Sequence, residues 1–257
     1  MRRYLMTLAV AAGLVGAGAS SEAETLRVGV EGAYPPFSMV NADGKLEGFD
    51  IDIAYALCEE MGVECELIAQ DWDGIIPALL ARKYDAIVAS MSITEERKQT
   101  VDFTQKYYQT PAKFVRPKGS DIEITEQDLD GKRVGVQRAT IHDNYLTDNY
   151  EGKVEIVRYG TQEEANLDLV AGRVDLLLAD SITLDEGFLQ TEAGQDFEFV
   201  GPDLTDPKWF GEGAGIAIRK DDDELDARLN AAIDAIRENG TYDKIAAKYF
   251  DFNVYGS

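Results

Sequence analysis

Two successive series of strand and helix patterns constrain the fold of this chain more than any other feature of its sequence. The first series has a β-rich apolar run at residues 26–30, a helical pattern at 51–61, a strand at 63–69, a helix at 74–82 and a strand at 84–89. Parallel strands need a crossover connection, which is usually a helix, so this order predicts an α/β unit with a largely parallel sheet.

A second series follows with the same order. Its expected elements are a strand at 133–136, a helix at 141–149, a strand at 154–159, a helix at 162–171 and a strand at 174–179. Pro111 and the segment Arg116-Pro117-Lys118-Gly119 interrupt the chain between the series, which favours two separate sheets. A strand at 215–219 and a helix at 223–238 complete the pattern, and no internal repeat is visible.

The patterns therefore predict two α/β lobes with a cleft between them. We expect the first lobe to comprise residues 24–111 and 206–257, and the second lobe to comprise residues 112–205. Two hinge strands would join the lobes, since the chain passes from the first lobe to the second and back.

The first residues are typical of a secretory signal peptide. Arg2 and Arg3 give a basic start, and the apolar run at residues 5–18 is shorter than the roughly 20 residues that a transmembrane helix needs. Small residues allow cleavage after Ala19 or Ala23. We therefore expect residues 1–23 to be removed and the protein to reside in the periplasm.

The net charge and the cysteine content limit the kinds of partner and bound group that suit this chain. A formal net charge of −23 makes nucleic acid an unsuitable partner. The acidic residues are spread along the sequence, which favours general solubility over a field that gathers cations, although both interpretations remain open.

Cys58 and Cys65 favour one short disulfide in an exported chain. A metal site is the alternative, but it would need more soft ligands, and His142 is the only histidine.

Five segments resemble the polar amino acid-binding proteins of ABC transporters. They are EGAYPPF at 31–37, GFDID at 48–52, WDGIIP at 72–77, MSITEER at 91–97 and GTYDKI at 240–245. The resemblance covers the chain after residue 23 and is nearest to the lysine/arginine/ornithine- and arginine/ornithine-binding branch. It implies a type II periplasmic binding fold that captures a basic L-amino acid and delivers it to the membrane permease of an ABC importer.

Arg97 is the first expected contact of the ligand. It follows Thr94, which is expected to cap a helix after a strand end. A guanidinium at this place is able to bind a carboxylate through two parallel hydrogen bonds, and the resemblance assigns it the ligand α-carboxylate. A surface pair with a glutamate is the alternative.

The α-ammonium is expected at the ends of two strands. Asp180 ends the strand at 174–179, and ligands of open α/β sheets bind at the carboxyl ends of strands. The resemblance assigns this carboxylate to the α-ammonium. Ser90 and Ser92 follow the strand at 84–89 and are placed to supply a carbonyl and a hydroxyl to the same group. A helix N-cap is the alternative role of Asp180, and plain turn formation is that of the two serines.

A second-lobe turn, Gln137 to His142, joins a strand to a helix, so its free N–H groups are expected to receive an anion. The resemblance implies that this anion is the ligand carboxylate. Ala139 stands where the family often has glycine. His142 is expected to face solvent more than ligand.

Specificity is expected at Glu31, Tyr34 and Trp72. Glu31 would accept hydrogen bonds from the distal cation, and the two rings would enclose the ligand methylenes. A buried, unpaired Glu31 would disfavour a neutral ligand, which supports a basic one. The expected ligand residues are Glu31, Tyr34, Trp72, Ala89, Ser90, Met91, Ser92, Arg97, Gln137, Thr140, Ile141, His142 and Asp180.

We expect a monomer without catalytic residues, metal or cofactor. The chain contains no P-loop, nucleophile-elbow or HExxH motif. Opine or histidine binding is the alternative, followed by a dehydratase-like enzyme or a sensor module on the same fold. The sequence does not rank arginine, ornithine, lysine and histidine.

Overall fold

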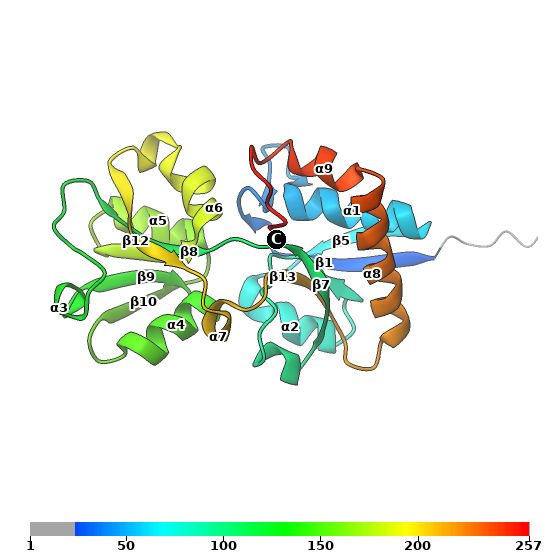
Figure 1. Cartoon of the computed structure of the whole chain (residues 1–257), viewed down its shortest axis with the longest axis horizontal. Coiled ribbons are helices and arrows are strands. Elements are labelled where there is room, and N and C mark those ends of the chain that lie inside the picture. Colours follow the sequence, from blue (N-terminus) through cyan, green and yellow to red (C-terminus); the bar gives the residue numbers. More distant parts are fainter. Residues whose placement is uncertain (1–23, 257) are drawn as a thin grey trace, which may run out of the picture.

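The computed structural model describes residues 24–256, which form two lobes side by side (Figure 1). The sheet of lobe 1 has the order β5 (Glu64–Ala69), β1 (Thr25–Val30), β6 (Ala86–Ile87), β13 (Ala214–Ile218) and β7 (Asp102–Tyr108). β1 runs parallel to β5 and β6, whereas β13 runs antiparallel to β6 and β7. A small separate sheet consists of β2 (Ala33–Tyr34), β3 (Ser38–Val40) and β4 (Leu46–Glu47).

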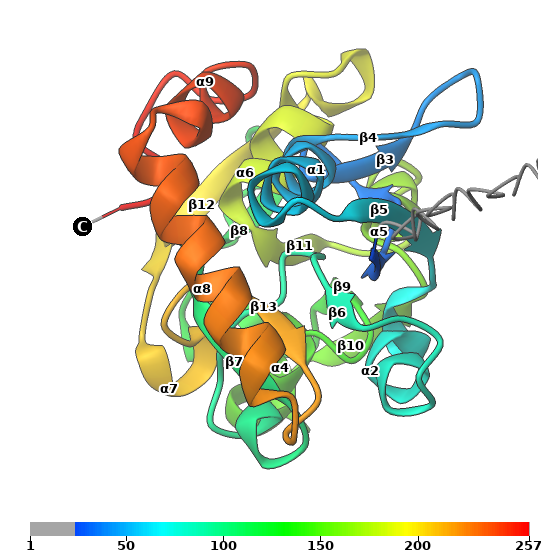
Figure 2. The same cartoon turned by 90° about the vertical axis from the view of Figure 1, so that its right-hand side faces the viewer.

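Helices cover both faces of the lobe 1 sheet. One face packs against α1 (Phe49–Met61), α8 (Asp223–Glu238) and α9 (Thr241–Ala246), and the other packs against α2 (Trp72–Leu80). Figure 2, viewed from the lobe 1 side, shows α8 and α9 apart from α2. α8 buries one apolar stripe that includes Leu225, Leu229 and Ile233, as its 3.6-residue spacing requires.

Lobe 2 repeats this design. Its sheet has the order β10 (Glu155–Tyr159), β9 (Arg133–Gln137), β11 (Leu176–Asp180), β8 (Ala112–Pro117) and β12 (Phe197–Leu204). Its helices are α3 (Glu126–Leu129), α4 (Ile141–Tyr150), α5 (Gln162–Val170) and α6 (Ser181–Leu184), and α6 continues into a π-helical turn at Asp185–Leu189. Within the described part of the chain, 3₁₀ turns lie at Arg97–Gln99 in lobe 1 and at Glu192–Gly194 in lobe 2.

The chain crosses between the lobes twice. It leaves lobe 1 after β7 and enters lobe 2 at β8, and it returns between β12 and β13 through α7 (Pro207–Phe210). Phe210 of α7 packs in the core of lobe 2 beside Tyr145 of α4. The two lobes are therefore joined covalently by two short crossings.

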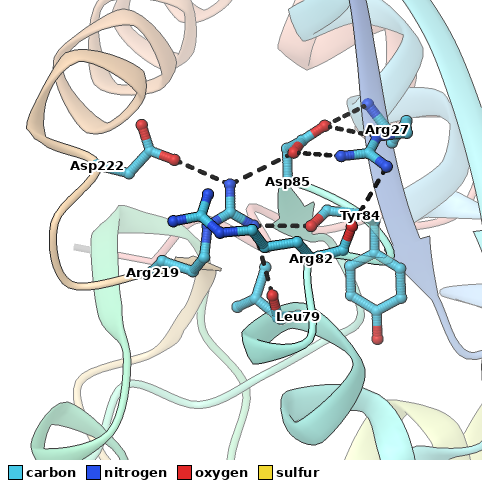
Figure 3. A network of polar contacts seen from close by, with 7 residues as sticks. All are labelled: Arg27, Leu79, Arg82, Tyr84, Asp85, Arg219 and Asp222. Carbon is cyan, nitrogen blue, oxygen red and sulfur yellow. Dashed lines mark hydrogen bonds and ion pairs between the residues drawn. The ribbon is translucent and has the colours of Figure 1, made fainter.

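The same four residues, Arg-Val-Gly-Val, begin at Arg27 in β1 and at Arg133 in β9. Arg27 donates from Nε and Nη2 to Asp85 at 3.0 and 2.9 Å, and Arg133 donates in the same way to Asp175 at 3.1 and 2.7 Å. This match extends over four residues only and marks corresponding strands of the two lobes. Arg219 extends the lobe 1 network to Asp85 and to Asp222 near the start of α8 (Figure 3).

This short match explains which residues meet at the cleft. Glu31 follows β1 and Gln137 ends β9, one residue beyond the matching Arg-Val-Gly-Val segments. Ser90 and Asp180 each lie five residues after the matching aspartates. Equivalent strand ends of the two lobes therefore face one another.

Cys58 and Cys65 form the predicted disulfide between α1 and β5. Within residues 24–256, no helix has the length and apolar character needed to cross a membrane. The signal-peptide prediction concerns residues 1–23 and lies outside the described residues.

Candidate functional site

A cavity of about 290 Å³ lies between the lobes. This volume is near the lower end of the range for small-molecule pockets and suits one small ligand. The predicted residues that line it are Glu31, Tyr34, Trp72, Ala89, Ser90, Ser92, Arg97, Gln137, Thr140, Ile141, His142 and Asp180. The carboxyl ends of strands in both lobes supply most of them, as the position of ligand sites in open α/β sheets predicts.

Arg97 places a cation in this cavity. Its Nη1 donates to the carbonyl oxygen of Ser92 at 3.0 Å, and its guanidinium lies 5.2 Å from the ring centre of Trp72. Burial lowers the pKa of Arg97 to about 10, which still leaves it charged at neutral pH. No carboxylate of residues 24–256 forms an ion pair with Arg97, so a ligand anion would supply a charge that the protein does not.

The first turn of α4 faces Arg97 from lobe 2. Thr140 caps the helix, with its Oγ1 accepting from the N–H of Asp143 at 3.2 Å and donating to the carbonyl of Gln137 at 2.8 Å. The first N–H groups of a helix have no intrahelical partner, and the helix dipole favours an anion there. Arg97 and the start of α4 therefore place two sources of positive potential at the cavity.

His142 lies in the cavity wall, beside Phe210, and is 7% exposed. The solvent-facing interpretation of His142 was therefore wrong, whereas its place among the expected ligand residues stays a prediction. Burial and then the nearby Arg97 lower the pKa of His142 to about 3. The imidazole is neutral at neutral pH and adds no charge to the cavity.

Three carboxylates are buried at or beneath the cavity, and we call Glu31, Asp50 and Asp180 the buried acid group. Glu31 Oε1 accepts from Gln137 Nε2 at 2.5 Å across the cleft. Burial raises the pKa of Glu31 to about 7, although this hydrogen bond opposes the shift. None of the three forms an ion pair with a cation of the described residues, so a cationic ligand would stabilise their ionised forms.

Asp50 lies behind the cavity wall. Its carboxylate accepts from Tyr107 Oη at 2.7 Å and from Ser90 Oγ at 2.9 Å. Burial raises the pKa of Asp50 to about 7. Ser90 has a left-handed φ of 53°, which is unfavourable for a residue with a side chain, and these contacts hold it in place.

Asp180 is a helix N-cap, the alternative role that the sequence allowed, and it also lies at the cavity. Its Oδ1 accepts from the N–H groups of Ile182 and Thr183 at 2.8 and 3.3 Å and so caps α6. Its Oδ2 accepts a short hydrogen bond from the Thr110 hydroxyl, and the residue also lines the cavity. Burial raises the pKa of Asp180 to about 6.

Two further predictions were wrong in detail. Met91 is fully buried in the lobe 1 core with Ile75 and does not line the cavity. Thr94 accepts from the N–H of Arg97 at 3.3 Å, but the expected helix is only a 3₁₀ turn, because the chain enters β7 at Asp102.

Part of the cavity wall consists of residues that were not predicted from the sequence. Apart from Gly256, the residues that were not predicted belong to the two crossings and their ends, and they include Tyr108, Gln109, Thr110, Pro111, Thr205, Phe210, Gly211 and Gly213. The only sequence signals there were Pro111 and the glycine-rich stretch around Gly211. Among residues 24–256, no group of three metal-binding side chains is present.

Comparison with known proteins gives a consistent result. Residues 26–252 match the family model described as bacterial extracellular solute-binding proteins, family 3. The chain is 56% identical over 233 residues to the L-arginine-binding protein of Pseudomonas aeruginosa, covering 90% of each chain. It is 43% identical to the lysine/arginine/ornithine-binding periplasmic protein of Escherichia coli, covering 100% of each.

A solved structure agrees with these relatives. A Salmonella typhimurium periplasmic binding protein, described as having high arginine specificity, superposes with a TM-score of 0.82 at 36% identity. The match covers 89% of this chain and 100% of that protein. All three relatives are named as binding proteins and none as an enzyme.

Proposed function

Because the chain belongs to the bacterial extracellular solute-binding proteins of family 3, we propose that its cleft captures a basic L-amino acid for an ABC importer. The observation that carries this proposal is the charge arrangement of the cavity. Arg97 has no carboxylate partner and the buried acid group has no cationic partner among the described residues. A ligand with one carboxylate and two cationic groups complements both Arg97 and the buried acid group.

One end of the ligand is a free α-amino acid. Its carboxylate would bind Arg97 and the start of α4, where two sources of positive potential converge. Its ammonium would lie near Asp180, Ser90 and Ser92. An N-substituted amino acid, such as an opine, would bring added bulk to the ammonium end and is disfavoured.

The other end of the ligand is a cation in the pocket of Glu31. The second carboxylate oxygen of Glu31 accepts no hydrogen bond from the described residues. Gln137 donates its amide nitrogen to both Glu31 and the carbonyl of Gly160, so its amide oxygen also stays available. A guanidinium has five donors in one plane and is able to use both acceptors.

Release requires movement of the lobes. Cavity residues come from both lobes, so a ligand would enter when the lobes are apart and complete its contacts when they close about the two crossings. The closed form would be the form that the membrane permease recognises. Action in the periplasm as a monomer completes the proposal.

Thermal unfolding against a ligand panel tests this function. A ligand at about 100 times its dissociation constant adds roughly 2.7 kcal/mol to the free energy of unfolding. We expect L-arginine, L-ornithine or L-lysine to raise the unfolding temperature, and D-arginine and neutral amino acids to leave it unchanged. A rise only with histidine, opines or neutral amino acids would refute the basic ligand, and no rise with any compound would refute the binding function.

A further inference from the structure

Two pairs of neighbouring residues contact each other across the rim of the cleft. Trp72 and Asp73 begin α2 in lobe 1, and Arg138 and Ala139 form the turn between β9 and α4 in lobe 2. Trp72 Nε1 donates to the carbonyl oxygen of Ala139 at 3.0 Å, and Arg138 Nε donates to Asp73 Oδ2 at 2.6 Å. We call these four residues the inter-lobe clasp.

The charged half of the clasp lies outside the ligand cavity. The side chains of Asp73 and Arg138 are 42% and 48% exposed, and neither lines the cavity. A further hydrogen bond between the lobes runs from Asn144 Nδ2 on α4 to Glu96 Oε2 at 2.9 Å. These contacts form only when the lobes are together, because each joins one lobe to the other.

The lobe 2 side of the clasp is held in a defined shape. Ala139 has a left-handed φ of 59°, an unfavourable conformation for a residue with a Cβ. Its N–H donates to Asp143 Oδ2 at 3.1 Å, and Asp143 in turn accepts from Arg158 Nε at 2.7 Å. These bonds fix the direction of the Ala139 carbonyl that Trp72 reaches.

The lobe 1 side of the clasp is connected to the ligand site. Trp72 lines the cavity, and its ring lies 5.2 Å from the guanidinium of Arg97. One side chain therefore contacts the expected carboxylate-binding residue, the cavity and lobe 2. An aromatic ring alone would serve the first two contacts, whereas the third requires the indole N–H.

We propose that Trp72, Asp73, Arg138 and Ala139 hold the lobes closed and set how long the cleft retains its ligand. This inference rests on the proposed function, because retention is measured with a basic amino acid. The lobes must open before the ligand leaves, so contacts unique to the closed state slow dissociation more than association. Loss of one neutral hydrogen bond should increase the dissociation rate about 3- to 10-fold, and loss of one half-exposed ion pair should increase it about 2- to 5-fold.

Dissociation of labelled L-arginine in an excess of unlabelled L-arginine tests the clasp. Trp72→Phe keeps an aromatic ring and removes the N–H, and Arg138→Gln removes the charge. The matched control is Arg173→Gln, which breaks a 2.6 Å pair with Asp168 within lobe 2. We expect dissociation to be about 3- to 10-fold faster for Trp72→Phe and about 2- to 5-fold faster for Arg138→Gln, with the control unchanged.

A charge exchange and a ligand-free measurement complete the test. The double variant Asp73→Arg with Arg138→Asp should return dissociation to within about 2-fold of the wild-type rate. Small-angle scattering of the empty protein should show a larger radius of gyration in Arg138→Gln than in Arg173→Gln. Wild-type dissociation rates in Trp72→Phe and Arg138→Gln, or an equal change in the control, would overturn the clasp. If L-arginine does not bind at all, the proposed function fails, and the scattering result alone decides the clasp.

Discussion

Replacing Glu31 by glutamine should weaken ligand binding and stabilise the empty protein at the same time. Glu31 is 9% exposed, and burial raises its pKa from 4.5 to about 7. A carboxyl whose pKa is raised by folding contributes stability below the unfolded pKa, and this contribution is lost as the pH rises through the folded pKa. At pH 7.5 most of this stability has been lost. The difference between the unfolded and folded pKa values corresponds to about 3 kcal/mol in the free energy of unfolding.

Glutamine has the same shape and no charge, so Glu31→Gln removes this loss. We expect the free energy of unfolding of the empty protein to rise by up to about 3 kcal/mol at pH 7.5 and to change little at pH 4.5. Affinity for L-arginine should fall roughly 10- to 150-fold, because one charge-assisted hydrogen bond is lost. Urea unfolding at both pH values and calorimetric titration measure the two effects.

The control is Glu163→Gln, which changes an exposed glutamate on α5. It should alter neither the stability nor the affinity beyond experimental error. If Glu31→Gln lowered the stability of the empty protein, or left the affinity for L-arginine unchanged, the account of Glu31 as a buried carboxylate awaiting a cation would be refuted.

Three further predictions concern charge, packing and the disulfide. A cationic ligand favours the ionised form of the buried acid group, so the affinity for L-arginine should fall as the pH drops. For one group with a pKa of about 7, the expected fall is roughly 50-fold between pH 7 and pH 5. Calorimetric titration across this range measures the change, and an affinity that does not depend on pH would contradict it. Gly29→Ala should lower the free energy of unfolding by about 1–3 kcal/mol in urea titrations, because its Cβ would lie 2.5 Å from the ring of Tyr84, and equal stability would show that the ring can shift. Replacing Cys58 and Cys65 by serine should cost roughly 2.5 kcal/mol for so short a loop, measured by thermal unfolding, and should leave the affinity for L-arginine unaltered.

The fold was largely predictable because the spacing of apolar residues agrees with the positions of helix- and strand-ending residues along most of the chain. The helix expected at 51–61 became α1, which ends at Gly62 in the left-handed conformation, and the helix at 223–238 matched α8. The small sheet of β2, β3 and β4 was missed because strands of two or three residues are too short to show a period.

The predicted cleft residues were also found together, because strand ends in α/β sheets are predictable places for polar side chains. Met91 was an avoidable error. Met91 is an apolar residue between two serines, so its side chain is expected in the core, whereas Ser90 and Ser92 line the cavity.

Contacts between the lobes could not be predicted from the sequence. Gln137 is 106 residues from Glu31, and their hydrogen bond depends on how the two lobes meet. The same holds for the burial of His142, which lies against Phe210 of the returning crossing. Local patterns place such residues on elements, but the packing of distant elements decides their partners.

Calorimetric titration of the purified protein with L-arginine and with L-citrulline tests the central claim most directly. The two ligands have nearly the same shape, and citrulline lacks the distal charge. The charge arrangement of the cavity predicts that L-arginine binds at least about 10-fold more tightly, with the difference removed in Glu31→Gln. Equal affinity for both compounds, or tighter binding of L-citrulline, would contradict the claim that the cleft recognises a basic amino acid.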